Sequence, residues 1–163
     1  GASALARLAL GLWSRYPGDP LVVEEVEELL LALVKDTEGR AAVLAIVVPS
    51  LTEVFDRARH DVRLCNVASS ALALMGETAN CSAKAQGGAE AEATRPVMVA
   101  ALGPVVGLLL ETDSHALVQE GCRCLEALVT AVGPALLVAS PAAVKRSSAL
   151  EVDWGASGSG GGA

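Results

Sequence analysis

Apolar residues recur at helical spacing in three stretches of the chain, and an aspartate opens each stretch. The last of them, residues 113–132, carries its apolar side chains on one face and its polar side chains on the other. The apolar positions are Ala116, Leu117, Cys124, Leu125, Leu128, Val129 and Val132. Asp113 and Ser114 stand where an N-cap belongs, and Gly133-Pro134 stands where a helix ends. The pattern predicts one amphipathic helix here.

Two earlier stretches, Asp19–Lys35 and Asp61–Thr78, repeat this pattern. All three contain an Ala-Leu pair, which begins at residues 32, 73 and 127, so the pairs are 41 and then 54 residues apart. The second interval contains a Gly/Ala/Glu-rich stretch of 13 residues, and removing it leaves 41. A helical period of about 40–47 residues is typical of HEAT and armadillo repeats.

Each of these helices is predicted to follow a partner helix. The partners span residues 4–16, 41–58 and 95–110. In the first partner, Leu5, Leu8, Leu12 and Trp13 are expected to face the core. Pro49 and Pro104 lie 24 and 23 residues before the Ala-Leu pairs of their own units. Each proline should kink its helix, because proline removes a backbone donor.

The sequence therefore predicts an all-α fold, an α-solenoid (ARM/HEAT superhelix) of about three HEAT-type helix pairs. The array should occupy residues 1–140, with pairs near residues 4–36, 40–79 and 94–133 and a connection at 37–40. Residues 80–94 lack an apolar stripe and contain Gly87-Gly88, so they are expected to form an inserted surface loop. A short helix is expected at 135–139, and residues 141–163 are expected to form a flexible low-complexity tail.

Composition agrees with close-packed helices. The chain is 52% hydrophobic but only 2% aromatic, so its core must consist of Leu, Val and Ala, which suits helices better than a β-sandwich. The formal net charge of −7 disfavours a nucleic-acid partner, because phosphate binding needs clustered Lys and Arg. No apolar run reaches the roughly 20 residues of a membrane span and no signal peptide is evident, so no membrane partner is expected.

Residues typical of catalytic and metal sites are sparse. The two histidines, His60 and His115, fall in predicted turns between helices, and no P-loop, GxGxxG, GxSxG or HExxH motif occurs. No histidine lies at metal-ligand spacing from the four cysteines, which are interpreted as reduced thiols: Cys65, Cys81, Cys122 and Cys124. We expect no enzyme activity, no metal and no cofactor.

The strongest charge feature is a group of four glutamates on the outer side of the 19–35 helix. They are Glu24, Glu25, Glu27 and Glu28. Two interpretations remain open. The group forms a solvated face near a helix N-terminus, where the helix dipole favours acidic residues. Alternatively, it forms an acidic strip for a basic ligand, provided that this helix lines a concave surface.

Three stretches resemble a known family. They are similar to the central HEAT repeats of the importin-β (karyopherin-β) family of nuclear transport receptors: Leu12–Leu33, Val47–Ala58 and Leu108–Val132. They occur in the same order and at similar separation, and with their connections they cover about residues 8–135. The third stretch is the most specific, because Asp113, the Gln119–Cys122 step and the Cys124-Leu125 pair match a distinctive helix of the family.

The resemblance implies a segment of a nuclear import receptor. Such receptors carry basic protein cargo, core histones among them, from cytoplasm to nucleus, and Ran in its GTP-bound form controls cargo release in the full-length receptor. In these arches the second helix of each pair lines the concave side. The candidate cargo-facing residues are then Glu24, Glu25, Glu27, Glu28, Glu120 and Glu126. The alternative is a stand-alone helical-repeat scaffold for protein–protein interactions, unrelated to import.

Overall fold

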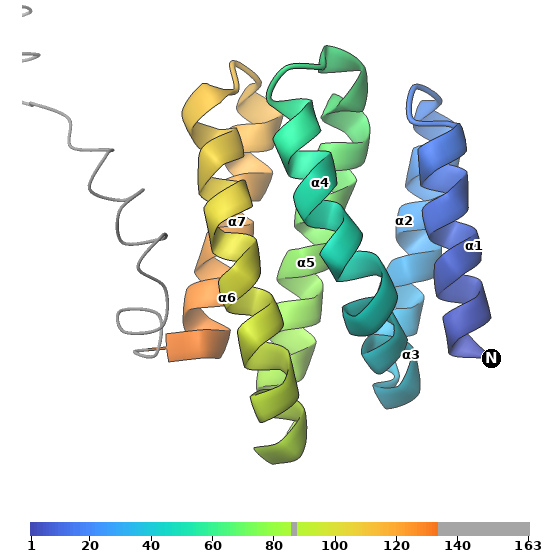
Figure 1. Cartoon of the computed structure of the whole chain (residues 1–163), viewed down its shortest axis with the longest axis vertical. Helices are drawn as coiled ribbons and strands as arrows, with labels where there is room; N and C mark the ends of the chain where they lie inside the picture. The colour runs from blue at the N-terminus through green and yellow to red at the C-terminus, as the bar shows by residue number, and fades with distance from the viewer. Residues whose placement is uncertain (86–87, 134–163) are drawn as a thin grey trace, which may run out of the picture.

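The computed structural model describes residues 1–85 and 88–133, and these residues form an all-helical fold (Figure 1). The α-helices, in chain order, are α1 (Ala2–Arg15), α2 (Pro20–Lys35), α3 (Thr37–Ala42), α4 (Val48–Ala58), α5 (Cys65–Lys84), α6 (Gly88–Glu111) and α7 (His115–Val132). A π-helical turn, Val43–Val47, joins α3 to α4, and a 3₁₀ turn, Val62–Leu64, leads into α5. The prediction of an all-α fold is confirmed. The helix predicted at 135–139 and the tail at 141–163 lie outside the described residues.

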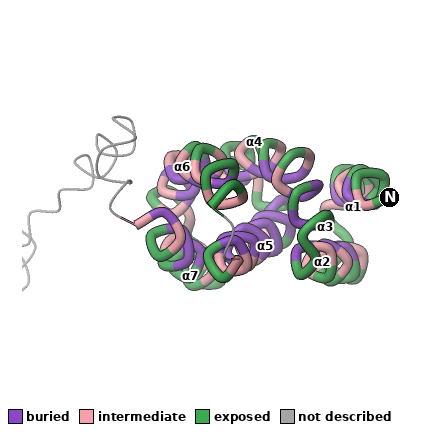
Figure 2. The backbone as a smooth tube through the Cα atoms, turned by 90° about the horizontal axis from the view of Figure 1, so that it is seen from below, coloured by how far each residue is buried: buried purple, intermediate pink, exposed green. Residues whose placement is uncertain are grey.

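The helices lie in two layers (Figure 2). One layer contains α2, α5 and α7, in which α5 packs between the other two. The other contains α1, the α3–α4 segment and α6, and α4 packs against α6. Helix α5 also packs against α4 and α6, so the apolar core runs between the layers around α5. This arrangement places the outer faces of α2 and α7 on the same side of the molecule.

The helix start and stop signals act as the sequence predicts. The Asp19 carboxylate accepts hydrogen bonds from two backbone N–H groups in the first turn of α2, at 3.1 and 3.3 Å, and Pro20 follows as the first helical residue. Ser114 caps α7 in the same way, and Gly133 ends that helix with a φ of 63°. These local signals explain why the boundaries of α2 and α7 are predicted well.

The predicted connection at 37–40 is wrong, because these residues belong to α3. The Asp36 carboxylate caps the helix by accepting hydrogen bonds from Glu38 and Gly39 N–H, both at 3.1 Å. The kink expected at Pro49 takes the form of the π-turn, in which the Val48 N–H bonds to the Val43 carbonyl five residues back. Pro49 then lies in the first turn of α4, where a missing donor costs little.

The inserted loop predicted at 80–94 is also wrong. Residues 80–84 are the last turn of α5, and residues 88–94 are the first turns of α6. The stretch lacks an apolar stripe, but it is rich in Ala and Glu, which are strong helix formers. Helix propensity therefore extends both helices beyond the core-forming part of the sequence.

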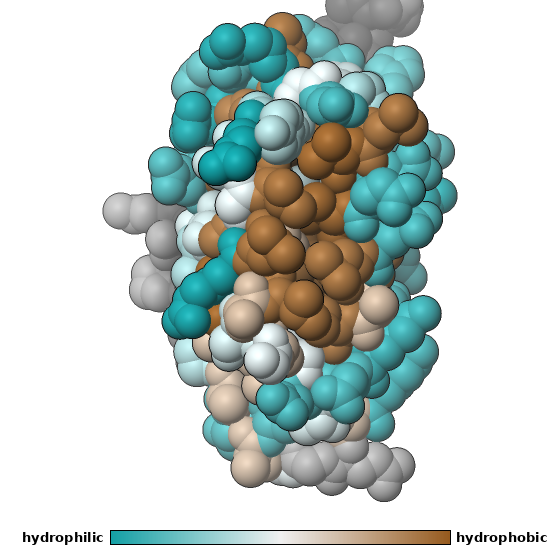
Figure 3. Space-filling model, turned by 90° about the vertical axis from the view of Figure 1, so that its right-hand side faces the viewer, coloured by the Kyte–Doolittle hydropathy of each residue, from teal (hydrophilic) through white to brown (hydrophobic). Residues whose placement is uncertain are grey.

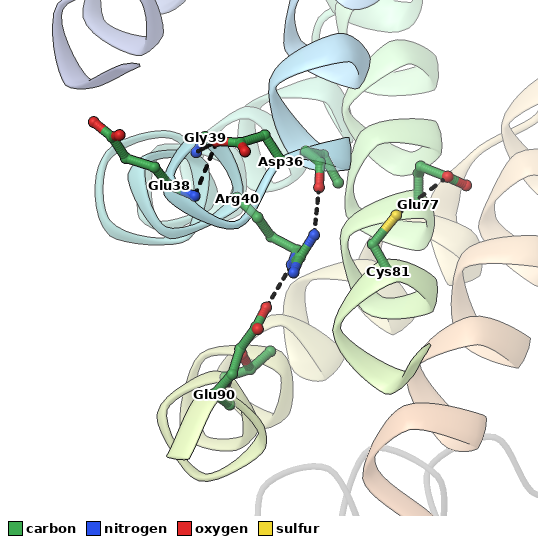
Figure 4. A network of polar contacts seen from close by, with 9 residues as sticks. Asp36, Glu38, Gly39, Arg40, Glu77, Cys81 and Glu90 are labelled. Atoms are coloured by element: carbon green, nitrogen blue, oxygen red, sulfur yellow. Dashed lines mark hydrogen bonds and ion pairs between the residues drawn. The ribbon is translucent and has the colours of Figure 1, made fainter. Parts of the chain in front are cut away.

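A buried arginine holds the start of α6 in place (Figure 4). Arg40 of α3 is only 5% exposed, and its guanidinium donates to the Val34 carbonyl at the end of α2 at 2.8 Å. It also forms an ion pair with the Glu90 carboxylate of α6. A buried charge needs such partners, so Arg40 links the ends of three helices.

The predicted inward face of α1 is wrong for two of its leucines. Leu5 and Leu8 are 42% and 55% exposed, whereas Ala6, Ala9 and Trp13 are buried. The small alanines let α1 approach its neighbours closely, and the Trp13 indole N–H donates to the Val23 carbonyl of α2 at 3.1 Å. The larger leucine face of α1 is left uncovered.

Candidate functional site

The fold separates the four glutamates of α2 into two groups. Glu24, Glu27 and Glu28 are spaced three and four residues apart, so they share the side of the helix that continues toward α5 and α7. Glu25 points elsewhere and lines a groove between α1 and α2. The sequence alone did not separate them, because all four lie outside the core-facing stripe.

Glu27 is the most constrained of these residues. It is half-buried, and its Oε2 accepts a hydrogen bond of 2.6 Å from the Ser70 hydroxyl of α5. Burial raises the pKa of the Glu27 carboxyl above its ordinary value, and the Ser70 hydrogen bond partly opposes that rise. The negative charges of Glu120, Glu24 and Glu28 raise the pKa further.

Helices α2 and α7 flank α5 in one layer, and the negative charge of Glu120 on α7 adds to the rise in the pKa of Glu27 on α2. Glu120 is half-buried and pairs with Arg123 one turn later, at 3.0 Å. Glu25 and Glu126 are exposed, and neither is among the charges that raise the pKa of Glu27. We therefore call Glu24, Glu27, Glu28 and Glu120 the acidic surface.

The sequence pattern indicated two of the three contributing helices but missed Ser70. The signal for Ser70 was present, since Ser69-Ser70 interrupts the apolar pattern of the 61–78 helix. A buried hydroxyl needs a hydrogen-bond partner, and Ser70 finds it in Glu27. This contact holds one carboxylate of the acidic surface in a defined position.

The acidic surface suits a ligand with several positive charges. Carboxylates on two helices can each meet a Lys or Arg side chain, and Arg123 is the cation that already pairs with one of them. Exposed pairs of this kind are individually weak and sensitive to salt, so affinity requires several of them at once. Within the described part of the chain, no group of three or more His, Cys, Asp or Glu could hold a metal ion.

The cysteines and histidines do not form a reactive cluster in the described residues. Cys122 is exposed, whereas Cys124 is buried, and all four thiols are free. Burial raises the pKa of the Cys124 thiol to about 12, and the charge of Glu120 adds to the rise, so this thiol stays protonated at neutral pH. His60 and His115 are both exposed at helix ends.

Helix α6 is the one described helix long and apolar enough to cross a membrane, judged by length and composition. Of its most apolar 18-residue window, 39% is buried inside the fold, where α6 packs against α4 and α7. One such helix is weak evidence for a membrane, because buried core helices have the same composition. The expectation of no membrane partner stays a prediction.

No protein-family model, curated protein or solved structure matches this chain. The class defined by the structure is an all-helical protein with two packed layers, and its function has to be inferred from its surfaces.

Proposed function

We propose that this chain is a segment of a nuclear import receptor of the importin-β family, present in cytoplasm and nucleus. It binds basic protein cargo, such as core histones, through the acidic surface, and Ran-GTP controls release in the full-length receptor. The observation that carries the proposal is the packing of α5 between α2 and α7, which brings carboxylates of α2 and α7 to one side of the molecule. Carboxylates far apart in the sequence thereby face one ligand.

The helix packing is compatible with three HEAT-type pairs. The pairs would be α1 with α2, the α3–α4 segment with α5, and α6 with α7. Their second helices, α2, α5 and α7, share one layer. The Ala-Leu pairs of these helices are 41 and 54 residues apart, and the longer interval contains the end of α5 and the start of α6. In a solenoid each repeat contacts its neighbours, and α5 packs against both α2 and α7.

The electrostatics favour a basic partner. The chain carries a formal net charge of −7, which would steer a positively charged protein toward it. The acidic surface would then hold Lys and Arg side chains of that partner, with a strong dependence on salt. Glu25 and Glu126 remain candidate cargo contacts of lesser weight, since they lie apart from the coupled group.

The first prediction compares two triple variants of the 163-residue chain. Replacing Glu24, Glu27 and Glu28 with Gln should weaken binding of core histones at least about fivefold at near-physiological salt, because three charge-assisted contacts are lost. The matched control replaces Glu38, Glu53 and Glu92, and should change affinity less than about twofold. Both triple variants change the formal net charge from −7 to −4.

Titration calorimetry of the two variants measures the difference directly. Equal losses would mean that net charge alone drives binding, and unchanged affinity in both would contradict the proposal. The import role is tested with the full-length receptor from its source cells. Ran-GTP should release bound histone from it, whereas a scaffold unrelated to import would keep histone bound.

A further inference from the structure

The two sides of the helical array differ in what they leave uncovered. On one side, α1 and α2 expose a stripe of apolar side chains (Figure 3), which an adjoining repeat of the proposed array would cover. Toward the other side, the ends of α5, α6 and α7 surround a half-enclosed cavity of about 190 Å³. The proposed function makes no use of this cavity.

Small side chains leave the cavity unfilled. The last turn of α5 and the first turns of α6 come from the Ala-rich stretch 80–94, which forms helix without an apolar stripe. Ala83, Ala85 and Ala91 line the cavity from this stretch, and Ala131 lines it from α7. Alanine favours a helix but brings only one methyl group to the space between helices. The stretch therefore extends two helices and leaves room between their ends.

One buried hydroxyl of the lining has no partner. Ser82 is 4% exposed, and its Oγ forms no hydrogen bond within the described chain. The hydroxyls of Thr94 and Thr130, which also line the cavity, each donate to the carbonyl four residues earlier at 2.8 Å. An unpaired buried hydroxyl is unfavourable, so Ser82 requires a hydrogen-bonding group from within the cavity.

Arg95 sets the charge of that group. Among the described residues that line the cavity, it is the only charged one. One of its N–H groups donates to the Glu92 carboxylate at 2.9 Å, and both side chains of this pair are exposed, so the pair is weak. A guanidinium has further N–H donors. Arg95 and Ser82 can therefore both donate to one anionic acceptor, and such charge-assisted hydrogen bonds are the stronger kind.

The size and the remaining walls of the cavity limit the rest of the ligand. Met98 and Val132 add apolar surface to that of the alanines. Drug-sized ligands occupy pockets of roughly 300–1,000 Å³, so a smaller molecule fits here. An inorganic oxyanion would place polar oxygens against the apolar walls, and a short alkyl chain avoids this cost.

We propose that the cavity between the ends of α5, α6 and α7 binds a short-chain carboxylate. Its carboxylate accepts hydrogen bonds from Arg95 and Ser82, and its alkyl chain packs against Met98 and the alanines. The site lies apart from the acidic surface, because Thr130 follows Glu120 by roughly 15 Å along α7. It goes beyond cargo binding and does not depend on it.

The second prediction uses sodium butyrate as the probe and the 163-residue chain, followed by nuclear magnetic resonance at constant ionic strength. The backbone amide signals of Ser82, Arg95 and Thr130 should shift, with a dissociation constant of about 1 mM. Butyramide, which has a similar shape and no charge, should bind at least about fivefold more weakly. Acetate should also bind more weakly than butyrate, because it buries less apolar surface.

Variants decide whether butyrate occupies this cavity. Arg95→Gln should weaken its binding at least about tenfold. Arg63→Gln is the matched control, because Arg63 also pairs with a nearby carboxylate at 2.9 Å but lies outside the lining, and affinity should change less than about twofold. Ser82→Ala should bind butyrate at least about threefold more weakly, while its thermal midpoint without butyrate should equal or exceed that of the wild type.

Several outcomes would overturn the proposal. Absence of any shift at about 50 mM butyrate would mean that the cavity holds only water. Equal binding of butyrate and butyramide, or unchanged binding in Arg95→Gln, would mean that Arg95 does not select the ligand. Tighter binding of inorganic phosphate than of butyrate at the same residues would make the cavity an oxyanion site.

Discussion

Glu27 shows how one residue combines a structural and a functional role. Its carboxylate is half-buried and accepts a hydrogen bond from buried Ser70, which ties α2 to α5. Burial and the charges of neighbouring glutamates raise its pKa, so the ionised form is less favourable in the folded chain than in the unfolded one. The unfavourable free energy of ionising Glu27 therefore lies where we propose that a basic ligand binds. A cation of the ligand would lower it.

The third prediction concerns Glu27→Gln, which keeps an acceptor for the Ser70 hydroxyl and removes the charge. Because the pKa of Glu27 is raised in the folded state, its charge lowers the free energy of unfolding at pH 7. This destabilisation disappears as the pH falls from the raised pKa to the ordinary value of 4.5, since the carboxyl is then protonated in both states. The variant should therefore be more stable than the wild type at pH 7, by less than about 1 kcal/mol, and equal near pH 4.

Thermal unfolding followed by circular dichroism at both pH values measures this difference. Exposed Glu53→Gln is the control, and its stability relative to the wild type should change little with pH. A Glu27→Gln protein that is less stable than the wild type at pH 7 would mean that the hydrogen bond outweighs the burial cost.

At the scale of elements, α3 shows how tertiary contacts determine a short helix. Its six residues begin immediately after α2, and an isolated helix of this length is unstable in water. The Asp36 cap and the Arg40 hydrogen bond to the Val34 carbonyl hold it against the end of α2. Gly39 permits that approach, because a Cβ placed there would lie 2.1 Å from the Leu33 carbonyl oxygen.

The fourth prediction follows from this contact. Gly39→Ala should lower the free energy of unfolding by about 1–3 kcal/mol, because backbone atoms must move to admit the new methyl group. The control is Gly11→Ala in α1, where nothing lies within 4 Å of the added Cβ. That change should raise stability by about 0.5–1 kcal/mol, since Ala favours helix over Gly. Urea unfolding of both variants measures whether the free energy of unfolding falls in Gly39→Ala and rises in Gly11→Ala.

At the scale of the whole molecule, α5 connects the parts of the core. It packs against α2, α4, α6 and α7, and its buried side chains meet both layers. The small residues of this helix, such as Gly76, allow close approach, since a Cβ at Gly76 would lie 3.5 Å from the Cα of Cys124 on α7. A destabilising substitution at the centre of α5 should therefore lower the stability of the whole fold.

The fifth prediction tests this centrality. Leu72→Ala should lower the free energy of unfolding by about 2–5 kcal/mol in a single cooperative transition, because Leu72 is fully buried. Leu8→Ala in α1 is the matched control, and it should cost well under about 1 kcal/mol because Leu8 is more than half exposed. Separate transitions in Leu72→Ala would mean that the two ends unfold independently.

Local sequence is sufficient for much of the fold. The caps at Asp19 and Ser114 and the stop at Gly133 act through hydrogen bonds within one turn of the chain, so the bounds of α2 and α7 follow from them. The predictions at 37–40 and 80–94 failed because they took the lack of an apolar stripe as a sign of a loop. Both segments lack an apolar stripe, yet they form helices, through a cap and tertiary contacts at α3 and through Ala and Glu propensity around residue 90.

Which faces become covered depends on neighbours that are distant in the sequence. Periodicity predicted that Trp13 faces the core, as it does, but only the packed structure shows that Ala6 and Ala9 are buried while Leu5 and Leu8 remain exposed. The sequence likewise predicted an acidic outer side of α2, but it could not separate Glu25 from Glu27 or bring Glu27 to Ser70 and Glu120. Helix formation depends on hydrogen bonds within a few residues, whereas burial and electrostatic coupling depend on contacts that exist only after the helices have packed.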